Sequence, residues 1–555
     1  MTKLKVPAAQ LFHLAGQTPD EIFFRQPVDG KWQEHSYASV AEQTRLMASA
    51  LLDLGFVQGE KIAIFAKNCM EWMIADWAIG LAGCISVPIF SSADRDTIDY
   101  VMEHSEAKAV FVGKLDNRQH YHEVFNSDIM TIAMPYPTIA CQKQWHELLA
   151  DTLVRTEFPT VTSGDVMTII YTSGSTGTPK GVVLEYQSYM NACHHYIMDI
   201  QNVVTFDRER YLSYLPLAHI TERVLGQGMA LYVGIVDARQ QISFVESLAS
   251  FADNLTDCSP TIFISVPRLW QKFQLGILSK ISQAKLDILL RIPLISGLIK
   301  KKVISGLGLS QVKLCASGSA PIGPDLLAWY ERLGINISQG WGMSETNAAG
   351  TTQVPYRSDK RTSIGRPLLN MDIRIGDNQE IQVKSDCLMR EYYKQPALTA
   401  EAFTRDGYFR TGDQGVRDED GYIHIIGRLK DIFKTAKGKY VAPAPIEAAL
   451  AKSVLFDQLC VVGINLSQPV VLAVLSDIGK NQSRQSVENE LIQLLDKINT
   501  TLEKHEKLDG IWILQEAWTV ENEMITPTLK IRRQNIEKRF ESLYSQPLPS
   551  KVSWQ

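Results

Sequence analysis

In the first third of the chain, short hydrophobic runs typical of buried strands alternate with longer stretches in which hydrophobic residues recur at helical spacing. The apolar runs 61–66, 85–89 and 107–112 are short and rich in β-branched residues, which predicts buried strands. The stretches 72–81 and 94–104 predict helices between them. A further helix is expected after a candidate capping box at 39–42, with Gly55 as its stop signal. Alternation of this kind predicts an α/β fold with mostly parallel sheets covered by helices.

The pattern changes after residue 430. Two strand-like runs, 458–464 and 470–476, are followed by a long helical pattern from Ser486 to about Lys504. This order is typical of a small α+β domain. A chain of 555 residues exceeds the size at which one hydrophobic core stops growing, so two or more domains are expected on length alone.

Composition and charge narrow the class of protein. The formal net charge is −5 and no basic tail is present, which gives no reason to expect a nucleic-acid partner. The eight cysteines form no CxxC pair, which argues against a disulfide framework or a zinc site and favours a reducing cytoplasm. The amino terminus lacks the apolar core of a signal peptide, and no apolar stretch reaches the ~18 residues of a spanning helix.

The first candidate for chemistry is the loop at 171–181, Tyr-Thr-Ser-Gly-Ser-Thr-Gly-Thr-Pro-Lys-Gly, between the apolar runs 165–170 and 182–184. Glycine lets the main chain approach a ligand closely, and successive N–H groups can form an anion-binding nest. Hydroxyls and one lysine add donors, which suits a polyphosphate. The spacing is not that of a Walker A motif. The loop residues in question are Thr172, Ser173, Gly174, Ser175, Thr176, Gly177 and Lys180.

Two short motifs follow strand-like runs further along the chain. Gly318-Ser319-Ala320 comes after 312–316, and Gln339-Gly340-Trp341-Gly342-Met343-Ser344-Glu345 comes after 335–338. Small residues at strand ends leave room for a flat ring, and ligands collect at the carboxyl ends of parallel strands. Trp341 can stack on a base, and Glu345 can hold Mg²⁺ through its carboxylate. Asp413, after a glycine, can accept hydrogen bonds from two ribose hydroxyls.

Together these motifs resemble, in sequence order, those of the adenylate-forming superfamily, and the resemblance extends from about Leu11 to Arg533. The phrase at 210–224 resembles the long-chain fatty acid–CoA ligase branch and implies that His219 lies near the carboxylate. A capping or packing role is the alternative for His219. The family usually has Tyr at the place of Trp341, so a hydrogen bond from a phenol is lost here.

The resemblance implies a role for each motif. The phosphate loop with Lys180 holds ATP, Thr176 and Glu345 hold Mg²⁺, and the motifs at 318–320 and 339–344 hold adenine. Asp413 and Arg428 hold the ribose, and Lys530 is the catalytic lysine. Lys430 is the hinge between a large domain, 1–429, and a small mobile domain, 430–555. The loop that meets CoA contains Lys437, Gly438 and Lys439.

The expected activity is therefore that of an ATP-dependent long-chain fatty acid–CoA ligase that works through an acyl-adenylate. Two alternatives stay open: a ligase that delivers the acyl group to an acyl carrier protein, and a non-catalytic relative that binds ATP or lipid. Oligomeric state and acid chain length are not predicted.

The segment 285–304 is apolar with a basic end at Lys300, Lys301 and Lys302. Arg291, Pro293 and Gly297 exclude a clean spanning helix. It is expected either to form two packed helices with a charged rim or to lie on the cytoplasmic face of a membrane, with the lysines at the head groups.

Overall fold

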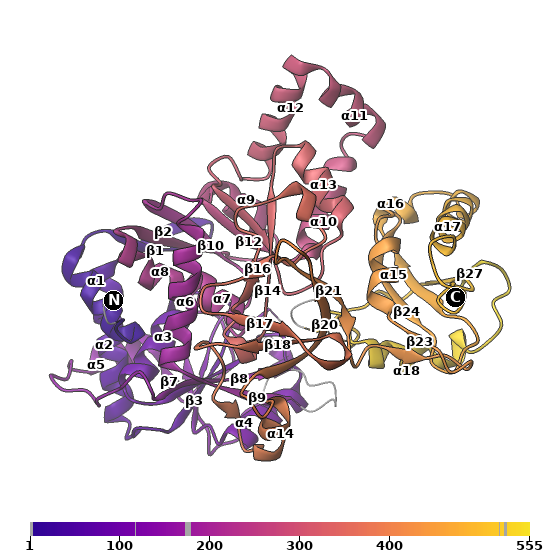
Figure 1. Ribbon diagram of the computed structural model, residues 1–555. Coiled ribbons are helices and arrows are strands. Elements are labelled where there is room, and N and C mark those ends of the chain that lie inside the picture. The colour runs from indigo at the N-terminus through magenta and orange to yellow at the C-terminus, as the bar shows by residue number, and fades with distance from the viewer. Residues whose placement is uncertain (1–3, 117, 122, 173–178, 521, 527–529) are drawn as a thin grey trace.

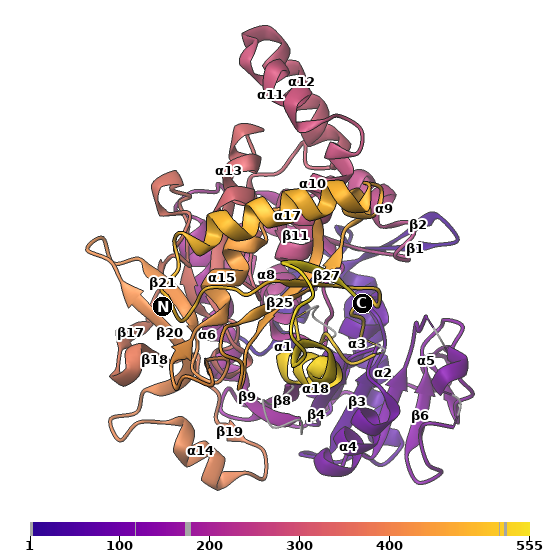
Figure 2. The ribbon, with the colours of Figure 1, turned by 90° about the vertical axis from the view of Figure 1, so that its right-hand side faces the viewer.

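A large region and a smaller carboxyl-terminal region lie side by side in the structure, a computed structural model that describes residues 4–116, 118–121, 123–172, 179–520, 522–526 and 530–555. Figure 1 shows the smaller region in yellow beside the rest of the chain, and Figure 2 shows it from its outer side. Of the predicted site residues, Ser173, Gly174, Ser175, Thr176 and Gly177 lie outside the described residues.

An eight-stranded sheet forms the base of the large region. From β8 to β7 its neighbouring strands pair in parallel, whereas β9 and β19 are antiparallel, so the expected mostly parallel sheet is confirmed. In spatial order the strands are β19 (Glu391–Tyr392), β9 (Lys180–Glu185), β8 (Val166–Thr172), β4 (Ile85–Ile89), β3 (Lys61–Phe65), β5 (Ala109–Val112), β6 (Met130–Ala133) and β7 (Lys143–Gln144).

Both faces of this sheet are buried, which explains the continuous apolar runs in the sequence. Along β3, Ile62 and Ile64 pack with helices α2 (Tyr37–Asp53), α3 (Met70–Leu81) and α6 (Tyr186–Ile200). Ala63 and Phe65 point to the opposite face and pack with α4 (Arg95–Ser105). Successive side chains of a strand point to opposite faces, so a strand with two covered faces needs apolar residues throughout.

The predicted capping box at 39–42 is wrong. Helix α2 begins earlier, at Tyr37, and its cap is Ser36, whose hydroxyl accepts a hydrogen bond from the N–H of Ser39 at 3.3 Å. Tyr37 and Val40 are buried, so the apolar face starts two residues before the predicted box. The burial of Tyr37 in the core therefore determines where the helix begins.

Three further sheets complete the large region. The first contains β10 (Arg208–Ser213), β11 (Arg239–Phe244), β1 (Ile22–Val28) and β2 (Lys31–Ser36). The second contains β12 (Ile262–Ser265), β13 (Leu314–Ser317), β14 (Ile337–Gly342), β15 (Gly350–Thr352) and β16 (Arg366–Pro367). The third contains β17 (Asp372–Ile375), β18 (Glu380–Lys384), β20 (Phe409–Arg417) and β21 (Ile423–Arg428). The other helices of this region are α1 (Pro7–Gln17), α5 (Trp145–Asp151), α7 (Ile220–Glu222), α8 (Met229–Tyr232), α9 (Phe251–Cys258), α10 (Pro267–Leu278), α11 (Gln283–Arg291), α12 (Pro293–Gly306), α13 (Pro324–Arg332) and α14 (Pro396–Ala402).

Strand β14 is longer than expected, and it contains residues 339–342 rather than preceding them. The glycines of this motif explain the difference. A Cβ on Gly342 would lie 1.9 Å from the carbonyl oxygen of Ala348, and β14 pairs with β15 through Gly340, Trp341 and Gly342. The absent side chains let the backbones approach, so the strand continues through the motif.

The smaller region is built on a separate four-stranded sheet, in which β24 (Phe456–Val462) is antiparallel to β25 (Val470–Leu475) and two parallel pairings follow to β26 (Ile511–Leu514) and β27 (Val552–Trp554). One face packs on α15 (Pro443–Leu450) and α17 (Arg484–Asn499), and the other on α18 (Arg533–Tyr544). Helix α16 (Asp477–Lys480) and the ribbon of β22 (Phe433–Lys434) and β23 (Tyr440–Val441) complete it. The predicted α+β organisation is confirmed. The exact boundary at 429/430 stays a prediction.

All eight cysteines are free, and all but Cys141 are buried. Burial raises the pKa of every one of these thiols, to about 12 for Cys84 and Cys315, and Cys141 shares the direction of the shift. Among the described residues no helix is both long enough and apolar enough to cross a bilayer.

Candidate active site

The antiparallel pairing of β9 with β8 and β19 brings a lysine, a tyrosine and a glutamate together. Lys180 stands opposite Thr172 at the ends of β9 and β8, next to the predicted phosphate loop. The Lys180 Nζ lies 5.1 Å from the centre of the Tyr392 ring, and the Tyr392 hydroxyl donates a hydrogen bond to Glu345 Oε1 at 2.9 Å. Tyr392 was not among the predicted site residues.

Glu345 is held in a short 3₁₀ turn, Ser344–Thr346, and is 8% exposed. Its backbone carbonyl accepts a hydrogen bond from Met389 N–H at 2.7 Å, which anchors the turn to the segment before β19. The pKa of Lys180 is lowered, mainly by burial and then by the charge of Lys430, while Glu345 acts in the opposite direction. Glu401 also acts in that opposite direction, so two cations, Lys180 and Lys430, interact with two anions here.

A second group forms where β14 meets β20 and β21. Asp413 and Arg428 are register partners on β20 and β21, and Arg428 Nε lies 2.9 Å from Asp413 Oδ1. The indole N–H of Trp341, on β14, donates a hydrogen bond to Asp413 Oδ2 at 2.8 Å. Tryptophan therefore supplies a donor of its own where the family usually has tyrosine. The sequence contained that signal, because an indole N–H is always a donor.

Lys530 comes from the smaller region and lies at this site. Thr526 frames its backbone, with hydrogen bonds of 3.0 Å from Lys530 N–H to Thr526 Oγ1 and 2.7 Å from Thr526 N–H to Lys530 O. The pKa of Lys530 is lowered to about 8, first by burial and then by Arg428, with Asp413 and Glu345 opposing. The structure thus places a lysine of the carboxyl-terminal region among predicted site residues of the large region.

His219 is the N-cap of α7, and its Nδ1 accepts a hydrogen bond from Thr221 N–H at 3.3 Å. Burial, with Lys530 as a further cause, lowers the pKa of His219 to about 3, so its ring is neutral at pH 7. The Thr221 and Ser319 hydroxyls are 3.4 Å apart, which links this helix start to the motif 318–320 after β13. The capping interpretation of His219 is confirmed, and the cap stands beside the site.

A buried ion pair holds the segment that follows His219. Arg223 donates to both carboxylate oxygens of Asp76 on α3, at 2.6 and 2.7 Å, and to Thr168 Oγ1 on β8 at 2.7 Å. Arg223 opens a π-helical stretch, Arg223–Gly228, in which every residue is buried. Sequence reasoning missed this pair, because two residues 147 positions apart carry no local signal.

Other predicted site residues have different surroundings. The side-chain amide of Gln339 donates to the backbone carbonyls of Arg361 and Ser363, both at 2.7 Å, which ties down the strand. Lys437, Gly438 and Lys439 form an exposed turn between β22 and β23, where Gly438 has a φ of +75°. A Cβ on Gly318, the residue after β13, would lie 3.1 Å from the carbonyl oxygen of Gly340 on β14, which favours glycine at this position.

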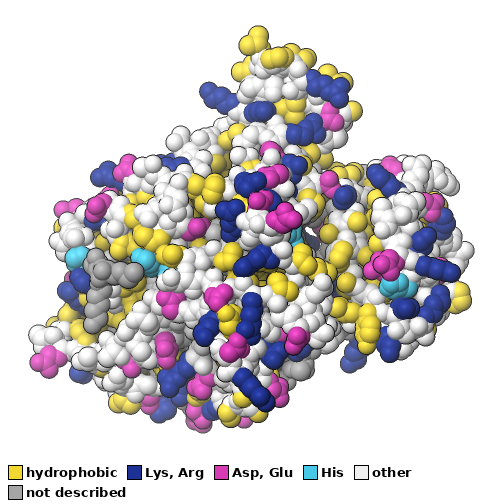
Figure 3. Space-filling model, viewed as in Figure 1, with side chains coloured by type: hydrophobic (Ala, Val, Ile, Leu, Met, Phe, Trp, Pro, Cys, Tyr) yellow, Lys and Arg dark blue, Asp and Glu magenta, His cyan; other side chains and the backbone are white. Residues whose placement is uncertain are grey.

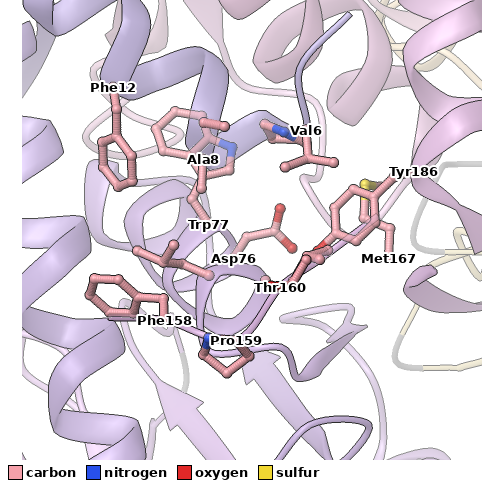
Figure 4. Close-up of a pocket in the computed structure, with 15 residues that line it drawn as sticks. Val6, Ala8, Phe12, Asp76, Trp77, Phe158, Pro159, Thr160, Met167 and Tyr186 are labelled. Carbon is pink, nitrogen blue, oxygen red and sulfur yellow. The ribbon is translucent and has the colours of Figure 1, made fainter. Parts of the chain in front are cut away.

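A cavity of about 330 Å³ lies elsewhere in the large region, and none of the predicted site residues that the structure describes lines it (Figure 4). Its wall is mostly apolar and includes Asp76, and Figure 4 shows that residue among Val6, Phe12, Trp77, Phe158 and Tyr186. This cavity is therefore separate from the group around Glu345 and Asp413.

Comparison with protein families gives two matches. Residues 11–393 match the family described as AMP-binding enzyme, and residues 430–546 match the AMP-binding enzyme C-terminal domain. Together they span both regions of the structure.

Curated relatives match over nearly the full length. The chain is 28% identical to the long-chain-fatty-acid–CoA ligase FadD15 of Mycobacterium bovis, covering 96% of each protein. It is 26% identical to long chain acyl-CoA synthetase 5 of Arabidopsis thaliana, covering 93% of this chain and 86% of that protein. Among solved structures, an anthranilate CoA ligase, AuaEII, in complex with anthranoyl-AMP superposes with a TM-score of 0.79 at 18% identity, covering 98% of this chain and 99% of that one. At that identity the likeness shows the fold alone.

Proposed function

Because the chain belongs to the AMP-binding enzyme family, we propose that it is an ATP-dependent long-chain fatty acid–CoA ligase. It converts a fatty acid, ATP and CoA into acyl-CoA, AMP and pyrophosphate through an acyl-adenylate. The observation that carries the proposal is the group of Lys180, Glu345, Asp413, Arg428 and Lys530, drawn to one place from separate strands and from both regions. The acid is proposed to be long-chain because the curated relatives named above are long-chain enzymes.

The first half-reaction activates the acid. A free carboxylate is a poor electrophile, because its charge repels a nucleophile and its leaving group is bad. Attack of its oxygen on the α-phosphorus of ATP forms a mixed anhydride and breaks the bond to pyrophosphate, which leaves with its electron pair. Charge accumulates on phosphate oxygens, so catalysis comes from positioning and from preorganised donors. Lys180 and the loop 172–177 are proposed at the pyrophosphate, and Lys530 at the α-phosphate and the carboxylate.

Mg²⁺ is the proposed metal, and the chemistry of the donor set fits it. Glu345 is a buried carboxylate, one of whose oxygens is held by Tyr392, so its other oxygen is the candidate hard ligand. Thr176, the second proposed ligand, lies outside the described residues. When bound, the ion would neutralise charge on the triphosphate. Tyr392 fixes the orientation of the Glu345 carboxylate whether or not metal is present.

The adenosine half of ATP is proposed to bind between Trp341, Asp413 and the motif 318–320. Asp413 has both carboxylate oxygens engaged, one by Arg428 and one by Trp341, so its orientation is fixed before the nucleotide arrives. Each carboxylate oxygen has further acceptor capacity, which leaves room for the ribose hydroxyls. The residues proposed at the ring are Gly318, Ser319, Ala320, Gln339, Gly340, Trp341, Gly342, Met343 and Ser344.

The second half-reaction transfers the acyl group to sulfur. The CoA thiolate attacks the acyl carbonyl, the bond to the phosphate oxygen breaks, and AMP leaves. Pantetheine needs the space that Lys530 occupies, so the small domain, 430–555, is proposed to rotate against 1–429 about Lys430 as a gating step. The exposed turn with Lys437, Gly438 and Lys439 is the proposed contact for CoA. Its lysines favour CoA over a carrier protein as the acceptor.

The test is a panel of carboxylic acids from about C2 to about C20, supplied with ATP and Mg²⁺, first with CoA and then with an acyl carrier protein. Release of AMP that depends on a long acid and on CoA supports the proposal. Release that depends on the carrier protein favours the second acceptor. Absence of acid-dependent pyrophosphate release would contradict the proposal and favour a non-catalytic relative. A cytoplasmic location is proposed from the eight free cysteines.

A further inference from the structure

Helices α11 and α12 form a hairpin that projects from the large region (Figures 1 and 2). The chain splits at Ile292, because Pro293 has no N–H to continue α11 and instead begins α12. One side of the hairpin packs on the core beside α13 through Leu286, Leu290 and Val303. The base of the hairpin is therefore fixed to the protein, while no residue of α12 is buried. The prediction of two packed helices is confirmed, because α11 and α12 pack on each other and on the core.

The end of the hairpin exposes a compact group of large apolar side chains, here called the apolar tip. Five of the fifteen large hydrophobic side chains exposed among the described residues fall within 288–298, namely Ile288 (60%), Ile292 (42%), Leu294 (87%), Ile295 (37%) and Leu298 (70%). The other ten are scattered singly or in pairs along the chain. Single exposed apolar residues are ordinary, whereas a concentrated group marks a surface that another body covers.

Positive charge surrounds the apolar tip. Residues 280–306 contain six basic side chains and one acidic one in a chain whose net charge is −5. The acidic one, Asp287, already pairs with Arg332 on α13. The basic residues are Lys280, Lys285, Arg291, Lys300, Lys301 and Lys302. Figure 3 shows blue and yellow side chains together on this projection, where they form a cationic collar around an apolar end.

We infer that the hairpin docks on a lipid bilayer that carries anionic head groups. On α12, Lys301 and Lys302 follow Leu298 by about one helical turn, which is ~5 Å along the axis. An interfacial helix buries its apolar face ~5–10 Å deep at the head-group boundary. With the apolar tip at that depth, the lysines reach the level of the lipid phosphates. Neither helix is long enough to span, so the contact is peripheral.

A bilayer fits these features better than a protein partner does. The apolar tip is convex and projects into solvent, whereas a protein interface of ordinary size needs a broad complementary surface. A bilayer adapts to any convex apolar end and supplies the counter-charge. The connection from β12 to β13 contains α10 and this hairpin, so the base of the hairpin is anchored to the sheet of β12, β13 and β14.

The docking goes beyond the proposed ligase function, and it is measured without any substrate. The full-length protein is sedimented with vesicles of phosphatidylcholine alone and with vesicles that contain about 30% phosphatidylglycerol, to give a negative surface. We expect binding to the anionic vesicles and little to the neutral ones. Raising salt from ~0.1 M to ~1 M shortens the screening length from ~10 Å to ~3 Å and should weaken the binding.

Two variants separate the apolar and the charged contributions. Leu294→Ser with Leu298→Ser removes the two most exposed side chains of the apolar tip, and the triple change of Lys300, Lys301 and Lys302 to Gln removes the collar on α12. Each is expected to lower the partition coefficient at least about tenfold. The matched control for the first is Leu153→Ser with Leu248→Ser, because both leucines are 88% exposed elsewhere. The control for the second is Lys497, Lys504 and Lys507 to Gln, on the exposed surface of the smaller region.

Four results would overturn the inference. They are absence of binding to both kinds of vesicle, unchanged binding by both hairpin variants, equal loss in the controls, and a hairpin variant that changes the oligomeric state but not vesicle binding. The last result would assign the apolar tip to a second copy of the chain. Acyl-CoA formation from a long-chain acid in vesicle-free solution is measured in parallel, so loss of ligase activity is distinguished from loss of docking. Circular dichroism verifies that each variant is folded.

Discussion

Removing the side chain of Lys530 tests whether one residue serves only the first half-reaction. The Lys530 backbone is held by Thr526 through two hydrogen bonds, so Lys530→Ala removes the ammonium without disturbing its frame. With a pKa of about 8, roughly nine-tenths of the side chain is charged at pH 7. Loss of one preorganised donor at developing charge typically costs ~10²–10³ in rate, or ~3–4 kcal/mol. We expect acyl-adenylate formation to fall by that factor.

The two half-reactions are assayed separately. Acid-dependent pyrophosphate release measures the first, and thioester formation from supplied acyl-adenylate and CoA measures the second. Lys530→Ala should reduce the first and leave the second within about twofold, because the lysine has left the site when the thiol attacks. Lys538→Ala, an exposed lysine on α18, is the matched control and should change neither. Equal losses in both half-reactions would refute the assignment.

The pH dependence gives a second check on the same side chain. The cationic form of Lys530 is the active one, and it is lost as pH rises through the folded pKa of about 8. For adenylation, kcat/KM should therefore fall above pH ~8, whereas kcat should hold to higher pH because bound triphosphate favours the cation. Lys530→Arg keeps its charge throughout and should remove the alkaline fall even if its rate is lower. An unchanged alkaline fall in that variant would contradict the reasoning.

Three further predictions concern residues around the site. Trp341→Phe removes the hydrogen-bond donor to Asp413 and should raise the KM for ATP several-fold, which corresponds to a loss of about 1–2 kcal/mol in the free energy of ATP binding. The kcat should change little, and a fall in kcat without a change in KM would count against this prediction. Arg223→Met leaves the buried Asp76 carboxylate without its partner and should lower the free energy of unfolding by about 3–5 kcal/mol in urea titrations. Arg208→Met, at an exposed ion pair, should change that free energy by no more than about 0.5 kcal/mol. The folded pKa of His219, about 3, lies below its unfolded value, so only the unfolded chain gains the proton as pH falls below about 6.5, and the folded state loses stability. His219→Gln should therefore lose less stability than the wild type between pH 7 and pH 5. Equal losses would contradict this.

The strands of the sheet and the motifs of the candidate site were predictable, because the signal for each lies in consecutive residues of the sequence. A strand such as β3, apolar on both faces, shows its burial in its own residues. The loop with Lys180, the turn with Glu345 and the Gly-Asp step within β20 that contains Asp413 likewise carry local signals. Their chemistry could be proposed before their positions were known.

What failed depended on how a segment packs in the fold rather than on its own pattern of residues. The start of α2 is set by what Tyr37 packs against, and the length of β14 by the close approach that Gly342 allows to Ala348. The Arg223–Asp76 pair and the contact of Tyr392 with Glu345 join different elements. The same limit applies to 285–304, where composition left two interpretations open and only the fold showed which side chains pack and which stay exposed.

The buried cysteines simplify the measurement of this activity. A thiol reacts with an aromatic disulfide or a maleimide only as its thiolate, and here seven of the eight sulfur atoms are buried and the pKa of all eight thiols is raised, including that of the partly exposed Cys141. In a reaction mixture held near neutral pH, CoA is then the only fast-reacting sulfhydryl, so its consumption can be followed directly by colour. The intact protein should contribute almost no background until it unfolds, and a late rise in colour would report denaturation rather than turnover.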